Sequence, residues 1–250
     1  MGVSIVIPTY RRPELVRRLL GSIQAQSYER FEIILVDDCS PEKREYAEIA
    51  VQFARVFEEF SYLRNSSNRG APYSRNRGIS RSKHELVALV DDDDEWLPDK
   101  LIKQVEVFST APASVGLVYT WTDVVKSGKA LPVYRAEIEG RCLRQILKEC
   151  FIPSPSVMLR KSALESAGLF DERLPSCQDW DMWTRIFKKG YEARVVRELL
   201  ALYHRQASHS LGTSDRARRG YVMYYRKHLP SLVRYGEWRH LMRMLRWMGG

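Results

Sequence analysis

The stretch that decides the fold is Val90-Asp91-Asp92-Asp93-Asp94-Glu95-Trp96, which follows the short apolar run 85–90. A short apolar run that ends abruptly in charge is typical of a buried strand. Five adjacent carboxylates repel one another unless a cation lies among them, and oxygen ligands suit Mg²⁺ or Mn²⁺. The alternative is an acidic, solvated loop. We favour the cation site because open α/β sheets bind ligands where their strands end.

The composition predicts an ordinary folded protein. Of the 250 residues, 44% are hydrophobic, which suits one large α/β domain or one domain with an appendage. We find no apolar run of about 18 residues that would span a membrane, and the opening β-branched run is unlike a secretory signal. The cysteines lack CxxC spacing, so we expect neither zinc nor disulfides, and a cytoplasmic location.

The net charge of +9 is concentrated near the carboxyl terminus. From Arg216 onward, nine basic residues accompany one acid, Glu237. Such a tail indicates a polyanionic partner, either membrane headgroups or nucleic acid. Apolar residues alternate with the arginines, as in a helix lying on an anionic membrane, although a helix packed on the domain or on another subunit is the alternative. We therefore expect a domain at 1–214, with halves 1–97 and 98–214, and a basic amphipathic helical tail at 215–250.

The first half of the chain alternates between strand and helix patterns. Strands are expected at 3–7, 31–36, 61–64 and 85–90, and helices at 15–23, 41–58 and 71–82. This alternation predicts an α/β fold with a mainly parallel, Rossmann-like sheet flanked by helices.

The second half is less regular. Helices are expected at 98–109, 141–149, 161–167 and from Cys177 to about Lys188, and strands at 115–121, 157–159, 191–197 and 199–204. A hairpin is expected at 127–129, around Gly128. The pair 191–197 and 199–204 would close the core before the basic tail.

Loops that follow parallel strands gather on one edge of a sheet, so Thr9-Tyr10, Asp37-Asp38 and Asp91–Asp94 are expected to converge. Carboxylates beside an aromatic ring form a suitable pocket for a nucleotide. Tyr10 suits stacking on a base, and Asp38 suits a hydrogen bond from a base imino group. The alternatives are that Tyr10 covers the sheet edge and that Asp38 caps the next helix.

A second group of functional candidates lies near the start of the helix from Cys177. Asp179 and Asp181 alternate with Trp180 and Trp183, which places an aromatic surface for a sugar ring beside a potential base. The alternative is that these carboxylates complement the helix dipole.

Two further side chains carry hypotheses of their own. Arg75, followed by Asn76 on the helix at 71–82, suits pairing with a diphosphate, although a surface arginine is the alternative. His209 suits a metal or a phosphate, although a structural histidine is the alternative.

Together these stretches resemble glycosyltransferase family 2, the inverting glycosyltransferases of the GT-A fold. The resemblance covers roughly residues 3–210 and is specific because five motifs occur in the right order. The motifs are Ser4-Ile5-Val6-Ile7-Pro8-Thr9-Tyr10-Arg11-Arg12, Val36-Asp37-Asp38-Cys39-Ser40, Asn68-Arg69-Gly70 with Arg75-Asn76-Arg77-Gly78-Ile79, Asp91-Asp92-Asp93-Asp94-Glu95-Trp96-Leu97-Pro98-Asp99-Lys100, and Gln178-Asp179-Trp180-Asp181-Met182-Trp183.

The resemblance implies roles for individual positions. Asp179 would be the catalytic base, and Asp93 would hold the metal; His209, considered above on its own chemistry, is the second expected metal ligand. The implied contacts to the nucleotide sugar are Pro8, Thr9, Tyr10, Arg11, Asp38, Arg75, Asn76, Asp91 and Asp92. Those to the acceptor or the sugar are Trp96, Gln178, Trp180 and Asp181. Gln178 is a departure, since an acid often precedes the base in this family. The repeated aspartates leave open which of Asp92 to Asp94 binds the metal.

The resemblance also implies the reaction. A sugar would move from a nucleotide-diphosphate sugar to a hydroxyl of a glycan or lipid-linked acceptor, with Mg²⁺ or Mn²⁺, in the biosynthesis of a cell-envelope polysaccharide. The enzyme would be cytoplasmic, with a peripheral contact to the inner face of the cell membrane. We do not expect a nucleic-acid partner.

Two competing functions remain open from the sequence. A nucleotidyltransferase would be expected to carry a glycine-rich, basic loop after the first strand, and residues 8–13 are basic but contain no glycine. A basic-tailed membrane or nucleic-acid adaptor with an inactive site would have little reason to keep the repelling carboxylates.

Overall fold

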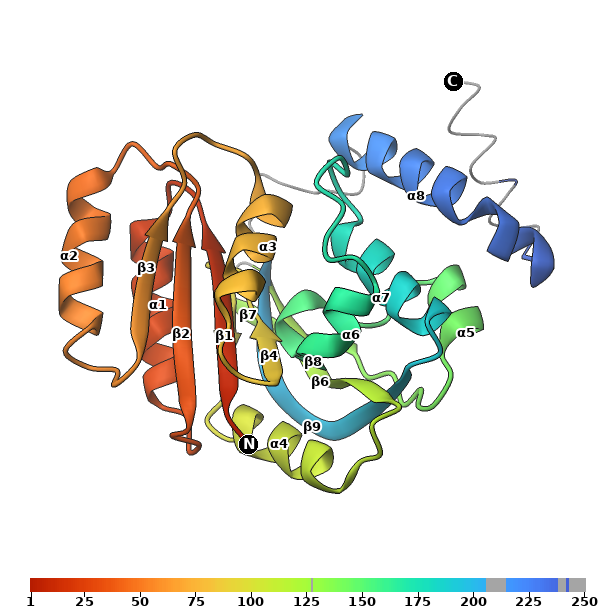
Figure 1. Cartoon of the computed structure of the whole chain (residues 1–250), viewed down its shortest axis with the longest axis horizontal. Helices are drawn as coiled ribbons and strands as arrows, with labels where there is room; N and C mark the ends of the chain where they lie inside the picture. The colour runs from red at the N-terminus through yellow and green to blue at the C-terminus, as the bar shows by residue number, and fades with distance from the viewer. Residues whose placement is uncertain (127, 206–214, 238–241, 243–250) are drawn as a thin grey trace.

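The computed structural model describes residues 1–126, 128–205, 215–237 and 242, and their strands form a single sheet flanked by helices (Figure 1). The first half follows the predicted alternation. Its elements are β1 (Val3–Thr9), α1 (Pro13–Gln24), β2 (Phe31–Asp37), α2 (Lys43–Phe53), β3 (Phe60–Arg64), α3 (Ala71–Arg81) and β4 (Leu86–Leu89). Helix α2 ends earlier than predicted, and beyond it Phe57 stacks on both Phe53 and Phe60.

The second half contains more elements than the sequence predicts. They are β5 (Glu95–Trp96), α4 (Lys100–Thr110), β6 (Val115–Lys126), β7 (Lys129–Tyr134), α5 (Leu143–Lys148), the 3₁₀ turn η1 (Ser154–Ser156), β8 (Met158–Arg160), α6 (Lys161–Ser166), α7 (Gln178–Lys188), β9 (Glu192–Arg205) and α8 (Asp215–Arg234). The predicted strand pair at 191–197 and 199–204 is wrong, because β9 is one strand. Its register against β6 shifts between Thr120, which faces Val196, and Trp121, which faces Leu199. This bulge interrupts the regular strand pattern, which is why the sequence predicts two strands instead of one.

The sheet is mixed, and it is parallel in the half that carries the acidic run. The strand order is β3-β2-β1-β4-β8-β6-β9-β5, with β7 paired to β6. Strands β3, β2, β1 and β4 are parallel, whereas β8 is antiparallel to both β4 and β6. The order reverses between β1 and β4, which is the switch point where open α/β sheets bind ligands. The α/β class is therefore confirmed.

Successive residues of a strand point to opposite faces, so the sheet has a core on each side. Ile5 and Ile7 of β1 face helices α1, α2 and α4, whereas Val6 faces α3 and the helices of the second half. Helix α3 lies close to β1 because Gly78 has no side chain: a Cβ there would lie 2.4 Å from Val6 Cγ1. This approach places the polar face of α3 at the edge where β1 and β4 end.

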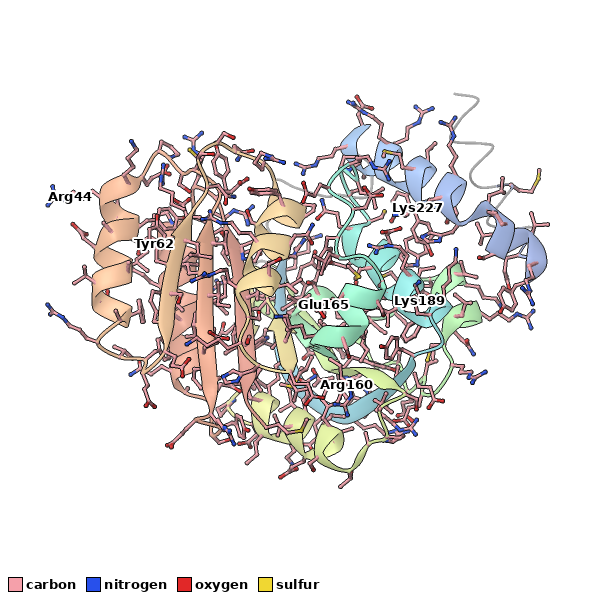
Figure 2. All side chains as sticks on the ribbon, in the orientation of Figure 1. Arg44, Tyr62, Arg160, Glu165, Lys189 and Lys227 are labelled. Atoms are coloured by element: carbon pink, nitrogen blue, oxygen red, sulfur yellow. The ribbon has the colours of Figure 1, made fainter. Side chains whose placement is uncertain are left out.

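The basic tail begins as a packed helix. The buried face of α8 comprises Ala217, Gly220, Tyr224, Tyr225, His228 and Leu232, and it covers α7 and α5 (Figures 1 and 2). Within 215–234 the tail therefore packs against the helices of the second half.

Among the described residues, no helix is long and apolar enough to cross a bilayer.

Candidate active site

The loops after β1 and β4 meet at the switch point of the sheet. Thr9 Oγ1 donates to Asp92 Oδ2 at 2.7 Å, and Arg12 Nη1 lies 3.1 Å from Asp92 Oδ1 and 2.8 Å from Asp93 Oδ2. Arg18, on α1, donates to the backbone carbonyl of Asp93. The predicted convergence of Thr9 with the aspartate run is therefore observed, and two arginines that we did not single out hold the run in place. The signal for Arg12 was its place in a basic loop directly after the first strand.

The aspartate run is short of positive charge. Burial raises the pKa of Asp92 to about 7, even though Arg12 opposes the shift. Burial also raises the pKa of Asp93, and repulsion from Asp91 is the second cause. The same two causes raise the pKa of Asp94 well above its ordinary value. Asp94 is fully buried, its Oδ1 accepts from the backbone of His204 at 3.3 Å, and its Oδ2 has no partner. These carboxylates are more negative than their surroundings can compensate.

This charge deficit fits a bound divalent cation. Within the described part of the chain, no group of three His, Cys, Asp or Glu side chains is already arranged as a metal site. The unpartnered oxygen of Asp94 and the partly exposed carboxylate of Asp93 are nonetheless hard oxygen donors of the kind that Mg²⁺ and Mn²⁺ prefer. His209, the other predicted ligand, lies outside the described residues.

Arg75 joins the two halves of the site. Its side chain is 5% exposed, Nη2 lies 2.5 Å from Asp91 Oδ1, and Nη1 donates to Gln178 Oε1 at 3.0 Å. Nη1 is also 3.8 Å from Asp179 Oδ1. Although burial disfavours its charge, the carboxylates of Asp91 and Asp179 raise the pKa of Arg75. A permanently charged guanidinium therefore connects the loop after β4 to the first turn of α7.

Asp179 has the properties of a group that accepts a proton. Its side chain is 28% exposed, so solvent or a substrate can reach it, yet Oδ1 is buried without a hydrogen-bond partner. Burial raises its pKa, Arg75 opposes that shift, and Asp91 adds to it. A carboxylate whose pKa is raised toward neutrality is a better general base than an ordinary one.

The loop after β2 is more ordered than the sequence suggests. Asp38 accepts from Asn65 Nδ2 at 2.7 Å and from the backbone N–H groups of Arg69 at 2.9 Å and Gly70 at 2.6 Å. It therefore fixes the 65–70 loop ahead of α3 rather than capping the next helix in the sequence, α2, which has no side-chain cap. Asp37, its neighbour, is buried and paired with Arg64, so it has a structural role.

The remaining residues predicted to bind the nucleotide sugar fall into two groups. Pro8 is buried at the end of β1, whereas Tyr10 is 40% exposed and Arg11 is exposed with a positive φ of 61°. Tyr10 and Arg11 are therefore available at the edge where the strands end. Asn76 instead turns away from that edge: Nδ2 donates to the Phe170 carbonyl at 2.9 Å, and Oδ1 accepts from the Phe170 N–H at 2.8 Å.

Three residues predicted to contact the acceptor or the sugar lie inside the fold. Trp96 is 2% exposed, and its indole N–H donates to Pro155 at 2.8 Å. Trp180 stacks on Tyr224 of α8 with ring centroids 4.1 Å apart, and Asp181 is completely buried. The aromatic surface that we expected to be open to a sugar is covered by α8, because the basic tail folds back over α7.

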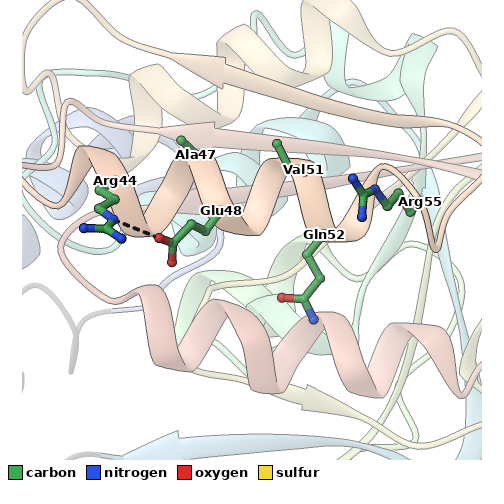
Figure 3. Close-up of a pocket in the computed structure, with 6 residues that line it drawn as sticks. All are labelled: Arg44, Ala47, Glu48, Val51, Gln52 and Arg55. Carbon is green, nitrogen blue, oxygen red and sulfur yellow. Dashed lines mark hydrogen bonds and ion pairs between the residues drawn. The ribbon is translucent and has the colours of Figure 1, made fainter.

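A shallow hollow on α2 is unrelated to these residues. Its lining comes from Arg44, Ala47, Glu48, Val51, Gln52 and Arg55, all on or just after that helix (Figure 3). Helix α2 borders the β3 edge of the sheet, on the opposite side of the molecule from α7 and α8 (Figure 1).

The class of fold is that of the GT-A glycosyltransferases. S. aureus TarS 1-349 in complex with UDP-GlcNAc superposes with a TM-score of 0.73 at 18% identity, over 92% of this chain and 67% of that one. The mannosyltransferase PcManGT from Pyrobaculum calidifontis, in complex with GDP-Man and Mn²⁺, gives 0.71 at 19% identity, over 91% and 64%. At such identities the likeness defines the fold alone.

The sequence defines the family. The model of glycosyl transferase family 2 matches residues 4–167, and the chain belongs to that family. A curated relative, the amylovoran biosynthesis glycosyltransferase AmsB of Erwinia amylovora, is 28% identical over 212 residues, which are 82% of this chain and 70% of that protein.

Proposed function

We propose that this protein is an inverting glycosyltransferase that moves a sugar from a nucleoside-diphosphate sugar to a hydroxyl of a glycan or lipid-linked acceptor. The observation that carries the proposal is the bridge made by Arg75. One guanidinium contacts Asp91, the first residue of the aspartate run, and approaches Asp179, the partly exposed carboxylate with a raised pKa. A positive charge between a donor edge and a base is the arrangement that a single displacement needs.

Each residue has a distinct task in this mechanism. Tyr10 and Arg11 receive the base, and Asp38 keeps the loop beside it ordered. Arg75 stabilises the negative charge that develops on the departing diphosphate. Asp179 takes the proton from the acceptor hydroxyl, which attacks the anomeric carbon and inverts it. A divalent cation held by Asp93, with Asp94 as the further oxygen donor, would supply charge neutralisation for the diphosphate.

The family and the buried site favour this function over the alternatives. The match to glycosyl transferase family 2 supports glycosyl transfer over nucleotidyl transfer. An adaptor with an inactive site would have no use for four adjacent, mutually repelling carboxylates. The name of AmsB supports a role in the biosynthesis of a surface polysaccharide.

We also propose a peripheral contact with the inner face of the cell membrane, in a cytoplasmic enzyme. The outward face of α8 supports it, since Leu229 is 37% and Val233 47% exposed, and the exposed basic residue Arg234 directly follows Val233. Flotation with anionic vesicles tests the contact: replacing Leu229 and Val233 by Glu should abolish it. Equal flotation of both proteins would contradict it.

The first experiment on the proposed function is a thermal-shift screen against UDP, GDP, dTDP, CDP and ATP, each with and without Mn²⁺. A Mn²⁺-dependent shift with one nucleoside diphosphate is expected, and it would identify the donor class. The variant Asp93→Ala should lose that dependence. A shift with a triphosphate alone would instead indicate a nucleotidyltransferase.

A further inference from the structure

Helix α8 holds the two residues that follow Asp179. The Trp180 ring stacks on Tyr224 with an interplanar angle of 22°, and the Tyr224 hydroxyl lies 2.9 Å from that of Thr184. Asp181 is completely buried, 2.9 Å from His228 Nε2 and 3.0 Å from Lys227 Nζ. The first turn of α7 is therefore fixed on one side by α8.

The start of α7 depends on the same helix. Cys177 has a left-handed backbone, with φ of 58°, and caps α7 with no side-chain hydrogen bond. From α8, Arg216 Nε donates to the Pro175 carbonyl at 2.8 Å. Gly220 allows α8 to approach this segment, since a Cβ there would lie 1.9 Å from Ser176 Oγ. These contacts hold the segment before α7, which begins without a side-chain cap.

The hydrogen bond between His228 and Asp181 has a defined donor and acceptor. Lys188 Nζ lies 2.7 Å from His228 Nδ1, on the other side of the ring from Asp181. An ammonium group only donates, so Nδ1 accepts and Nε2 carries the hydrogen that is donated to Asp181. Arg185 Nε donates to the same carboxylate at 2.8 Å. Because these groups are buried, a displaced α8 would leave charges without partners, which strongly disfavours other positions of the helix.

We propose that α8 is a brace for the catalytic helix, and that Tyr224, Lys227 and His228 are positioning residues for Asp179. Asp179 itself faces α3, where Arg75 lies, so the brace holds the backbone of α7 while leaving the carboxylate free for the acceptor. This inference rests on the proposed function. It assigns to the start of the basic tail a role inside the reaction, in a segment beyond the residues 4–167 that the family model matches.

The test compares four variants of the full chain. His228→Ala removes the donor to Asp181, His228→Gln keeps one amide donor and one acceptor, and Lys227→Met removes the ammonium group. Arg219→Ala, at an exposed position of the same helix, is the matched control. With the donor found in the thermal-shift screen, His228→Ala and Lys227→Met should lower kcat about tenfold or more, because small displacements of reacting groups are costly. Donor KM should stay within about twofold, and His228→Gln and Arg219→Ala should keep most of the wild-type kcat.

The outcomes separate the brace from the proposed function. Unchanged kcat in folded His228→Ala and Lys227→Met would overturn the inference, as would an equal loss in Arg219→Ala. If His228→Ala does not fold, Lys227→Met decides, because Lys227 is partly exposed. If the wild type transfers sugar from no donor, the proposed function fails, and hydrogen exchange then tests the brace alone. Faster exchange of the first turns of α7 in His228→Ala and Lys227→Met supports it, and unchanged exchange overturns it.

Discussion

Asp94, in the aspartate run at 91–94, and Asp181 are both buried carboxylates, and their surroundings are opposite. Asp94 has one oxygen without a partner, and burial and neighbouring acids raise its pKa. Asp181 is contacted by Arg185, Lys227 and His228. Although burial opposes its charge, these partners hold the pKa of Asp181 below its ordinary value.

The difference separates a binding site from a structural one. A buried carboxylate without enough neighbouring cations lowers the stability of the free protein. Its presence therefore indicates that a ligand supplies the missing positive charge. A buried carboxylate surrounded by cations is already satisfied and has no capacity left for a substrate. Asp179, only two residues from Asp181, belongs with the first group by its raised pKa and its unpartnered Oδ1.

The largest expected effect tests that assignment of Asp179. Asp179→Asn removes the proton acceptor while keeping the shape of the side chain, so the transfer rate should fall about 10²- to 10⁴-fold. Donor affinity, measured by calorimetry with Mn²⁺, should stay within a few-fold. Near-normal turnover in the variant would place the base elsewhere.

Asp181→Asn should instead damage the fold. The change leaves Lys227 and His228 without their buried anion, and breaking a buried ion pair costs about 3–5 kcal/mol of unfolding free energy. Urea denaturation followed by circular dichroism measures the loss. A variant as stable as the wild type would show that the cations around Asp181 do not contribute to stability.

Asp94→Asn should instead increase the stability of the metal-free protein. It removes a buried, repelled charge and keeps the oxygen that accepts from the backbone of His204. In the metal-free protein we expect a gain of about 1 kcal/mol, which raises Tm by roughly 2–4 °C for a chain of this size. Differential scanning calorimetry in EDTA provides the measurement, and a lowered Tm would remove the contrast with Asp181.

The smallest expected effect concerns pH. Burial lowers the pKa of His228 below its ordinary 6.5, despite the hydrogen bond to Asp181. The unfolded chain therefore binds the proton more readily than the folded protein, and stability falls as pH drops below about 6.5. The lowered pKa of Asp181 acts in the same direction, with stability lost as pH falls below 3.8.

The variant His228→Gln isolates the histidine contribution. Its unfolding free energy should decline less steeply than that of the wild type between about pH 7 and 5, by roughly 1 kcal/mol over the window. Parallel urea titrations at several pH values measure both slopes. Identical slopes would indicate that His228 titrates alike in the folded and unfolded chains.

The sequence predicted most of the first half because its signals are local. Short apolar runs at 3–7 and 31–36 and a helical pattern at 71–82 correspond to β1, β2 and α3, and parallel strands bring Thr9 next to Asp92. The second half was harder because its pairing is non-local. Strand β8 lies antiparallel between β4 and β6, and the bulge in β9 resembles a loop in sequence.

Side-chain patterns identified the acidic run, Arg75 and Asp179, because such charges are rarely buried without a purpose. The sequence alone therefore determined the fold class and the family, along with candidates for the site. Only the tertiary structure decided which carboxylates lack partners and which are satisfied. From the sequence, Trp180 and Asp181 were predicted to contact the sugar. In the structure α8 covers both, because the burial of a residue depends on segments that are distant in the sequence. Local sequence encodes the chemistry that a residue can perform, and the fold decides whether that residue can be reached.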